Sequence, residues 1–352
     1  MRRSTNNPWL HRYAVGVALM TLALIGLGGL VTSHGVGLAV PDWPTTYGYN
    51  MFFFPVSKWV GGVFYEHTHR LLASAVGLLT VILAVWLWLQ EERAWVRWLG
   101  VGAVGAVSLQ GVLGGLRVVQ FKDELGIFHA GLAQLFFVLL GALALFTSRW
   151  WHEAARARLA VYGGDGLRYV YLLTSGMILL QLILGATMRH QHAGLAIPDF
   201  PLAYGGLWPA MDAGAVAAYN QQRLEATALN PITPAHVALQ MAHRLGALLI
   251  LLAVAWTAFM TAQRVGRRAS LTKWSFGWLA LILLQALLGA LTIWSNKSAD
   301  IATAHVVVGA LSLLSGTLLF LAATRCLVNA TAPRAVRAVQ PSVVGASVKL
   351  PA

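Results

Sequence analysis

Eight long segments of the sequence contain no lysine, arginine, aspartate or glutamate and are strongly apolar. A helix of about 20 residues crosses the roughly 30 Å hydrocarbon core of a bilayer, and each segment has about that length. Lipid leaves only helices or closed barrels as spanning structures, and barrel strands would be shorter and alternate in polarity. The sequence therefore predicts an all-α, multi-pass membrane protein with eight transmembrane helices, within residues 13–41, 71–90, 98–116, 125–148, 169–188, 245–263, 274–296 and 301–324.

The distribution of cations predicts the orientation in the membrane. With the N-terminus inside, the inner loops and tails hold 17 of the 25 lysines and arginines, and the outer side holds the other 8 with 8 of the 12 acids. Positively charged loops remain on the cytoplasmic side, so we expect a cell inner membrane protein with both termini cytoplasmic. The cations are scattered over short loops and form no single basic surface, which argues against nucleic-acid binding.

An internal repeat divides the chain into two halves. Residues 37–48 return as residues 194–205 with eight of twelve positions identical, and the pairs His69-Arg70 and His243-Arg244 also correspond. Each half has an even number of helices, so the two repeats run in the same sense about an axis along the membrane normal. We predict two tandem four-helix bundles with pseudo-two-fold symmetry, over residues 12–148 and 168–325, followed by a flexible inner-face tail at 326–352.

Four histidines lie near the outer ends of apolar segments and recur in both halves. A haem iron with two axial imidazoles takes one histidine from each of two facing helices. A single histidine at this depth could equally be satisfied by a carbonyl or a water, but four in a duplicated register favour haem ligation. We predict two haem-iron sites near the outer face, with the ligand pairs His69/His129 and His243/His305.

Non-haem metal sites fit the sequence less well. Zinc or di-iron sites need several converging ligands, such as a Glu-x-x-His motif on each of two helices. Glu66 and His69 have this spacing, but the corresponding residues Met241-Ala-His243 lack a carboxylate. The single cysteine, Cys326, excludes an intramolecular disulfide and a thiolate cluster.

Glu66 is predicted to take part in proton chemistry, because only the first half has a carboxylate beside its histidine. The alternative is an acid that stabilises a helix N-terminus by about 0.3–1 kcal/mol. Arg70 and Arg244 are predicted to pair with haem propionates, although extension of these side chains toward the interface would also explain them. Interior glycines such as Gly28 and Gly114 are interpreted as close-packing positions without a chemical role.

The repeated outer loop contains a Pro-Asp-aromatic-Pro-x-x-Tyr-Gly element. Proline on both sides of an aromatic residue predicts a rigid, non-helical turn. Such a turn could cover a haem edge and restrict water, or it could be a plain cap. His34, His190 and His192 lie at the starts of these loops but do not correspond between the halves, so they are not predicted ligands.

The order and spacing of these motifs resemble the haem A synthase family along nearly the whole chain. The resemblance implies an enzyme that oxidises the C8 methyl group of haem O to the formyl group of haem A for a terminal haem-copper oxidase. It places substrate haem O at His69 and His129, with Glu66 in the reaction, and a resident haem b at His243 and His305. The matching motifs are Gly28-Gly29-Leu-Val-Thr, Gly37-Leu-Ala-Val-Pro-Asp-Trp-Pro, Glu66-His-Thr-His69-Arg70, Gln110-Gly-Val-Leu-Gly-Gly, His129, His243-Arg244 and His305.

The resemblance also implies partners. Haem O would come from a haem O synthase, and the oxidation needs an electron donor that the sequence does not identify; a homo-oligomer is compatible with this interpretation. The chain departs from many family members, since Thr45 and Thr46 lie where a loop cysteine pair is expected. A di-haem cytochrome that only passes electrons and a haem carrier are alternatives. A haem O-forming prenyltransferase is not, because no Asp-x-x-x-Asp element is present for diphosphate-bound magnesium.

Overall fold

The computed structural model describes residues 7–120, 122–154, 159–161, 163–222 and 231–329, which form helices almost throughout. Eight helices in these ranges are long and apolar enough to cross a membrane, which confirms the predicted all-α, multi-pass architecture. The helices are α1 (Pro8–Ser33), α2 (Gly61–Gln90), α3 (Ala94–Gln120), α4 (Asp123–Phe146), α5 (Arg149–Ala154), α6 (Gly164–His190), α7 (Ala213–Gln222), α8 (Pro234–Val265), α9 (Ser270–Trp294) and α10 (Ala299–Cys326).

The ends of the helices differ from the ends of the uncharged segments because capping groups decide where a helix starts. The Asn7 side chain accepts hydrogen bonds from two backbone N–H groups of the first turn of α1, and the Thr233 hydroxyl accepts one, from His236, at the start of α8. Each capping residue is followed by a proline. The first uncharged segment runs on to residue 41, but α1 ends at Ser33 and Gly35 turns the chain with φ +67°. The remaining apolar residues belong to the loop before α2.

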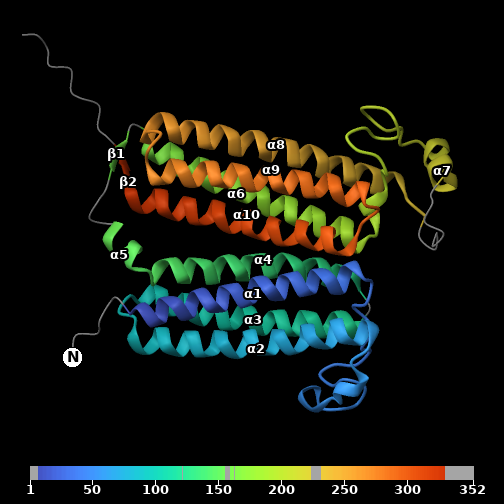
Figure 1. Ribbon diagram of the computed structural model, residues 1–352, viewed down its shortest axis with the longest axis horizontal. Helices are drawn as coiled ribbons and strands as arrows, with labels where there is room; N and C mark the ends of the chain where they lie inside the picture. The colour runs from blue at the N-terminus through green and yellow to red at the C-terminus, as the bar shows by residue number, and fades with distance from the viewer. Residues whose placement is uncertain (1–6, 121, 155–158, 162, 223–230, 330–352) are drawn as a thin grey trace, which may run out of the picture.

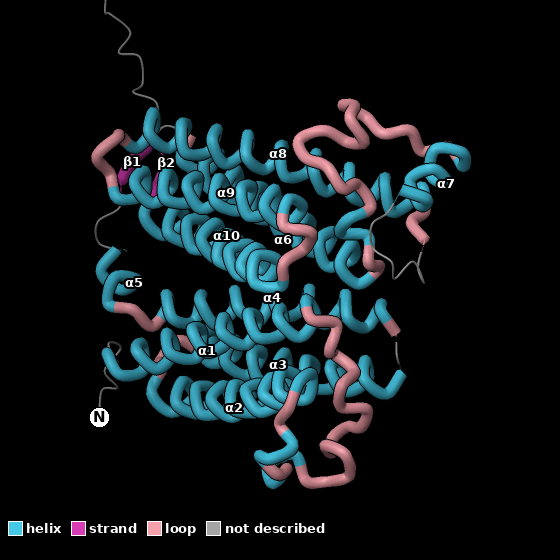
Figure 2. Tube along the Cα trace, turned by 45° about the vertical axis from the view of Figure 1, so that its right-hand side comes forward, coloured by secondary structure: helices cyan, strands magenta, loops and turns pink. Residues whose placement is uncertain are grey.

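The spanning helices form two groups that lie side by side (Figures 1 and 2). In the first half, α1, α2, α3 and α4 contact one another around a core that includes Leu87 and Leu140. In the second half, α6, α8, α9 and α10 surround Tyr171 and Trp278. The halves meet where α1 and α4 contact α10 and where α4 contacts α6. Pseudo-two-fold symmetry and independent domains over the predicted ranges stay predictions.

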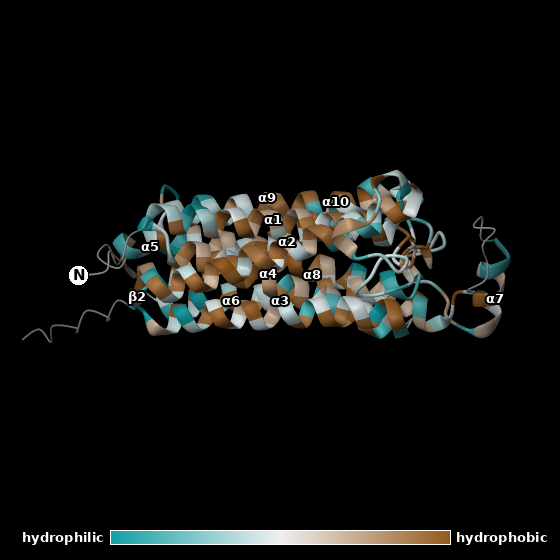
Figure 3. Ribbon diagram, turned by 90° about the horizontal axis from the view of Figure 1, so that it is seen from below, coloured by the Kyte–Doolittle hydropathy of each residue, from teal (hydrophilic) through white to brown (hydrophobic). Residues whose placement is uncertain are grey.

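The two ends of the bundle carry different features. The start of α1, α5 and two short strands lie at one end, whereas the long loops before α2 and α8 lie at the other (Figure 1). Hydrophobic residues dominate the middle of the helices, and hydrophilic residues gather at both ends (Figure 3). Strand β1 (Leu159–Val161) pairs in parallel with β2 (Leu327–Asn329), a contact that the sequence analysis did not predict. The predicted flexible tail beyond these strands, residues 330–352, lies outside the described residues.

Candidate functional site

The four predicted ligand histidines all lie toward the loop end of the bundle. Each occupies the first third of its helix, and α2, α4, α8 and α10 all begin at that end (Figure 1). The ring centroids of His243 and His305 are 6.5 Å apart, with the ring planes 63° apart. His69 and His129 lie close enough to interact electrostatically. The structure therefore brings together the two predicted pairs, one within each half.

The surroundings of these imidazoles fit a metal held between two rings. The Nδ1 atoms of His69, His129 and His243 are buried and have no hydrogen-bond partner among the described residues, although buried polar atoms are normally satisfied. Metal–imidazole bonds are roughly 2 Å long, so the 6.5 Å between His243 and His305 leaves room for one ion. Within the described ranges, no three His, Cys, Asp or Glu side chains converge on one point. Two imidazoles alone suit an iron whose porphyrin supplies the equatorial ligands.

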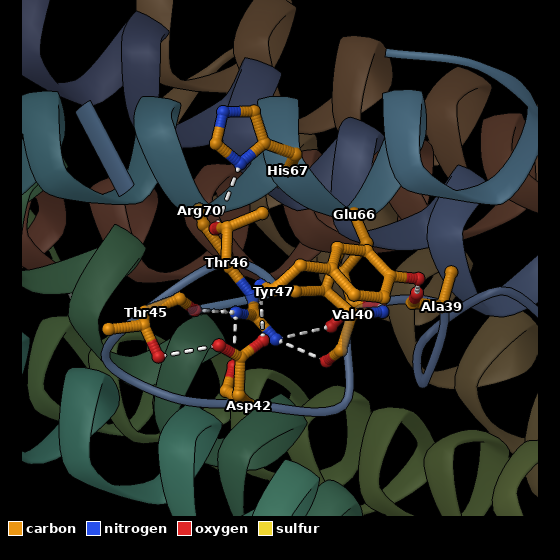
Figure 4. A network of polar contacts seen from close by, with 9 residues as sticks. All are labelled: Ala39, Val40, Asp42, Thr45, Thr46, Tyr47, Glu66, His67 and Arg70. Atoms are coloured by element: carbon orange, nitrogen blue, oxygen red, sulfur yellow. Dashed lines mark hydrogen bonds and ion pairs between the residues drawn. The ribbon is translucent and has the colours of Figure 1, made fainter. Parts of the chain in front are cut away.

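Glu66 is buried near the N-terminal end of α2 and faces the first loop (Figure 4). One carboxylate oxygen accepts the backbone N–H of Val40 at 2.8 Å, and the other lies 2.8 Å from the Arg70 guanidinium. The carboxylate therefore joins the loop to the helix three residues before His69. This arrangement holds an ionisable oxygen beside a predicted ligand, and it also has a structural function.

Gln240 occupies the corresponding position in the second half. Its amide oxygen accepts the backbone N–H of Ile197 at 2.6 Å, as Glu66 accepts that of Val40, and its amide nitrogen donates to the Ile197 carbonyl at 3.1 Å. This pair was not predicted, because Glu66 was compared only with Met241-Ala-His243, the residues after Gln240. Alignment of Glu66-x-x-His69 with Gln240-x-x-His243 would have found it. The two halves therefore share a loop contact and differ in its charge.

Arg70 and Arg244 both bind loop carbonyls. Arg70 donates to the carbonyls of Val40, Asp42 and Thr45 at 2.6–3.1 Å (Figure 4). Arg244 likewise donates to the carbonyls of Leu202, Asp199 and Ile197. The structure thus gives each arginine a loop-holding function that the sequence analysis did not assign, and their pairing with haem propionates stays a prediction.

The repeated loop has the same internal hydrogen bonds in both halves. The Asp42 carboxylate accepts the N–H groups of Tyr47 and Gly48, and Asp199 accepts those of Tyr204 and Gly205. Both tyrosines adopt positive φ values, 50° and 53°. Burial raises the pKa of the Asp42 carboxyl, but the hydrogen bonds from Gly48, Thr45 and Tyr47 outweigh this effect, so the pKa is lowered from its ordinary value. The element is therefore a folded turn, as its prolines predicted.

Threonines lie where the family resemblance led us to expect cysteines. The Thr45 hydroxyl donates to the Asp42 carboxylate at 2.5 Å, and the Thr46 hydroxyl lies 3.2 Å from Nδ1 of His67. His67 is fully buried and packs against the rings of Phe54 and Trp59. Hydrogen bonds and aromatic packing therefore hold this loop, and His67 takes part in both through Thr46, Phe54 and Trp59.

The loop aromatic residues contact helices α3 and α9. Trp43 lies so close to Gly115 of α3 that any side chain at that glycine would collide with the indole. In the second half, Phe200 packs against Trp294 of α9, which donates to the Phe200 carbonyl at 3.1 Å. The first loop therefore reaches the helix position next to Gly114, which faces His129. Coverage of a haem edge by this loop stays a prediction.

Three other histidines at the loop end of the bundle have neighbours of their own. His34 stacks on Tyr65, with 4.7 Å between ring centroids, and His192 has φ +55° at the start of a 3-10 turn. His190 is buried against Gly126. The sequence analysis did not single out Arg189, which joins the two halves by donating to the Gly29 carbonyl and the Ser33 hydroxyl of α1, both at 2.5 Å.

Comparison with known proteins gives consistent matches along the chain. Residues 11–317 match the family model COX15-CtaA, described as cytochrome oxidase assembly protein. A protein named heme A synthase from Geobacillus kaustophilus (strain HTA426) is 28% identical over 325 residues, 86% of each chain. Proteins of that name from Lysinibacillus sphaericus (strain C3-41) and Bacillus cereus (strain AH187) are 26% and 28% identical, over 90% and 91% of this chain and 95% and 96% of their own.

Proposed function

Since this chain belongs to the COX15-CtaA family of cytochrome oxidase assembly proteins, we propose that it converts haem O into haem A for a terminal haem-copper oxidase. It is a multi-pass membrane enzyme and an oxidoreductase, and its reaction oxidises the C8 methyl group of haem O to a formyl group. The observation that carries the proposal is the difference between two otherwise similar histidine sites, because Glu66 in the first half is replaced by the neutral Gln240 in the second.

In this proposal the first half binds the substrate. His69 and His129 ligate the iron of haem O, and the buried carboxylate of Glu66 moves protons released as the methyl group is oxidised. Arg70 holds the carboxylate at 2.8 Å, and Val40 donates its N–H to it, so its position is fixed before substrate binds. The first loop, closed over α2 and α3 by Glu66 and Trp43, limits access of water from the outer side.

The second half holds a resident cofactor. His243 and His305 ligate a haem b, which supplies one-electron redox chemistry when bound. Gln240 keeps the loop contact there without an ionisable group, so this site needs no proton-transfer residue. In the proposal, Arg70 and Arg244, which lie at the loop end of each site, also pair with haem propionates.

The cation distribution supports an inner membrane location with cytoplasmic termini and haem sites near the outer face. The N-terminal end of α1 and the C-terminal end of α10 lie at the same end of the bundle, as this orientation requires (Figure 1). Haem O is delivered by a haem O synthase within the membrane. Conversion of its methyl group to a formyl group is an oxidation that removes electrons from the substrate, so the reaction also needs an oxidant, and a separate electron donor if that oxidant is molecular oxygen.

The test is extraction of haems from cells that make this protein together with a haem O synthase, followed by separation by mass. Hydroxylated or formyl haem is expected, and it should be absent from cells with the synthase alone. If haem O were recovered without hydroxylated or formyl haem from cells whose membranes contain the folded protein, the proposed activity would be overturned.

A further inference from the structure

We propose that four glycines, Gly28, Gly114, Gly185 and Gly289, are positioning residues that fix the imidazoles of the four ligand histidines. The proposal rests on the proposed function, because it assigns these residues to the two haem sites. It revises the sequence-based interpretation of interior glycines as packing positions only.

Each glycine lies on the spanning helix that precedes a ligand helix and faces the edge of one imidazole ring. A Cβ atom added to Gly28 of α1 would lie 3.0 Å from Cε1 of His69, and one added to Gly114 of α3 would lie 3.3 Å from Cε1 of His129. The same ring atom is the nearest neighbour in all four cases. In the second half the corresponding distances are 3.2 Å for Gly185 of α6 and His243, and 3.1 Å for Gly289 of α9 and His305.

A glutamine four residues before three of these glycines contacts the same histidine. Residues four apart share one face of a helix, so the glycine and the glutamine contact the histidine from the same helix face. The side-chain amides of Gln110 and Gln181 donate to the backbone carbonyls of His129 and His243 at 3.0 and 2.7 Å. In the third case the backbone carbonyl of Gln285 lies 3.1 Å from Nδ1 of His305. The motif Gln-x-x-x-Gly therefore marks three of the four positions, and Leu24 replaces the glutamine before Gly28.

Other glycines on the same helices have different nearest neighbours. A Cβ atom added to Gly29 of α1 would lie closest to Thr303, and one added to Gly115 of α3 would lie closest to Trp43. A Cβ atom added to Gly16 of α1, Gly111 of α3, Gly176 of α6 or Gly277 of α9 would meet no atom within 4 Å. Glycine inside a helix costs about 0.5–1 kcal/mol relative to alanine. At the four proposed positions this cost is offset by the close approach of a helix backbone to an imidazole.

The physical consequence is control of ring position. A methyl group at any of the four glycines would force the imidazole to shift by a few tenths of an ångström. Groups that orient a metal-ligating histidine typically affect metal affinity by about 10- to 100-fold when they are changed. An alanine at these positions should therefore weaken haem binding and shift the reduction potential while the helices stay folded.

The experiment compares Gly185→Ala and Gly289→Ala with the matched controls Gly176→Ala and Gly277→Ala in the full-length protein in detergent. The measurements are haem retained per protein, the reduced-minus-oxidised spectrum and the midpoint potential. Gly185→Ala and Gly289→Ala should retain roughly tenfold less haem per protein than the unsubstituted protein, or haem with a shifted midpoint potential. Gly176→Ala and Gly277→Ala should match the unsubstituted protein in both measurements.

Equal behaviour of each variant and its control would overturn the inference. Size-exclusion profiles and helical circular dichroism separate haem loss from unfolding: a folded, haem-poor Gly185→Ala or Gly289→Ala protein supports positioning, and unfolding of both variants contradicts it. Failure of the proposed function has a different signature, because an unsubstituted protein without haem, or with haem but without haem A formation, would be seen before any variant is made.

Discussion

Substitution of Glu66 by glutamine separates the two functions that the structure allows for this carboxylate. Gln240 shows that an amide can make the loop contact, since its oxygen accepts the Ile197 N–H and its nitrogen donates to the Ile197 carbonyl. In Glu66→Gln the same pair of bonds can form with Val40. Arg70 keeps its bonds to three loop carbonyls.

The expected loss of stability is small. The substitution removes one charge-assisted hydrogen bond to Arg70, worth about 1.5–3 kcal/mol, and the amide adds a neutral hydrogen bond worth about 0.5–1.5 kcal/mol. The free energy of unfolding should therefore fall by about 1–2 kcal/mol. Glu66→Ala should cost more, because the buried Val40 N–H then loses its acceptor at a cost of about 1–3 kcal/mol in addition.

The expected loss of activity is large for both variants. If the carboxylate moves protons, haem A formation should fall by about 10²- to 10⁴-fold in Glu66→Gln and Glu66→Ala alike. The assay is mass-resolved haem extraction, with thermal unfolding and the haem b spectrum measured on the same preparations. A Glu66→Gln protein that makes haem A at close to the unsubstituted rate, while Glu66→Ala does not, would show that only the loop contact matters and would refute the proton-transfer function.

Three further substitutions or conditions test other parts of the structure. His243→Ala should abolish the haem b spectrum, because it removes one of two imidazoles whose ring centroids are 6.5 Å apart. The control His192→Ala, in the loop before α8, should leave the spectrum unchanged. Retention of the spectrum in His243→Ala would contradict the ligand assignment. Lowering the pH should release the first loop only in strong acid, because the pKa of Asp42 is lowered in the folded protein. The ionised Asp42 carboxylate stabilises the folded loop fully at pH values above the ordinary aspartate pKa of about 3.9. This stabilisation is lost as the pH falls through the lower pKa of the folded state. Amide protection factors of Tyr47 and Gly48 would measure this, and loss of protection already near pH 6 would argue against Asp42 as the group that holds the turn. Arg189→Met should weaken the contact between the halves by about 3–6 kcal/mol, about 1.5–3 kcal/mol for each of the two hydrogen bonds to α1 that it removes. An unfolding temperature equal to that of Arg267→Met, a change at an exposed arginine, would count against it.

The sequence by itself determined the secondary structure class, and it predicted which histidines form pairs. Lipid cannot satisfy an exposed backbone, so long uncharged segments had to be helices. Duplication of the loop and of the His-Arg pairs then placed His69 and His243 at equivalent depth. These features are local or periodic, and they can be read without knowing which helices are neighbours.

Contacts between segments far apart in the chain could be decided only by the tertiary structure. The placement of Arg70 on loop carbonyls, the pairing of Glu66 with Val40, and the approach of Gly114 and Gly289 to imidazole edges each depend on how helices and loops pack. An arginine near a membrane surface can bind a carbonyl, a propionate or a headgroup. Only the neighbours that the fold supplies determine which of these partners it meets.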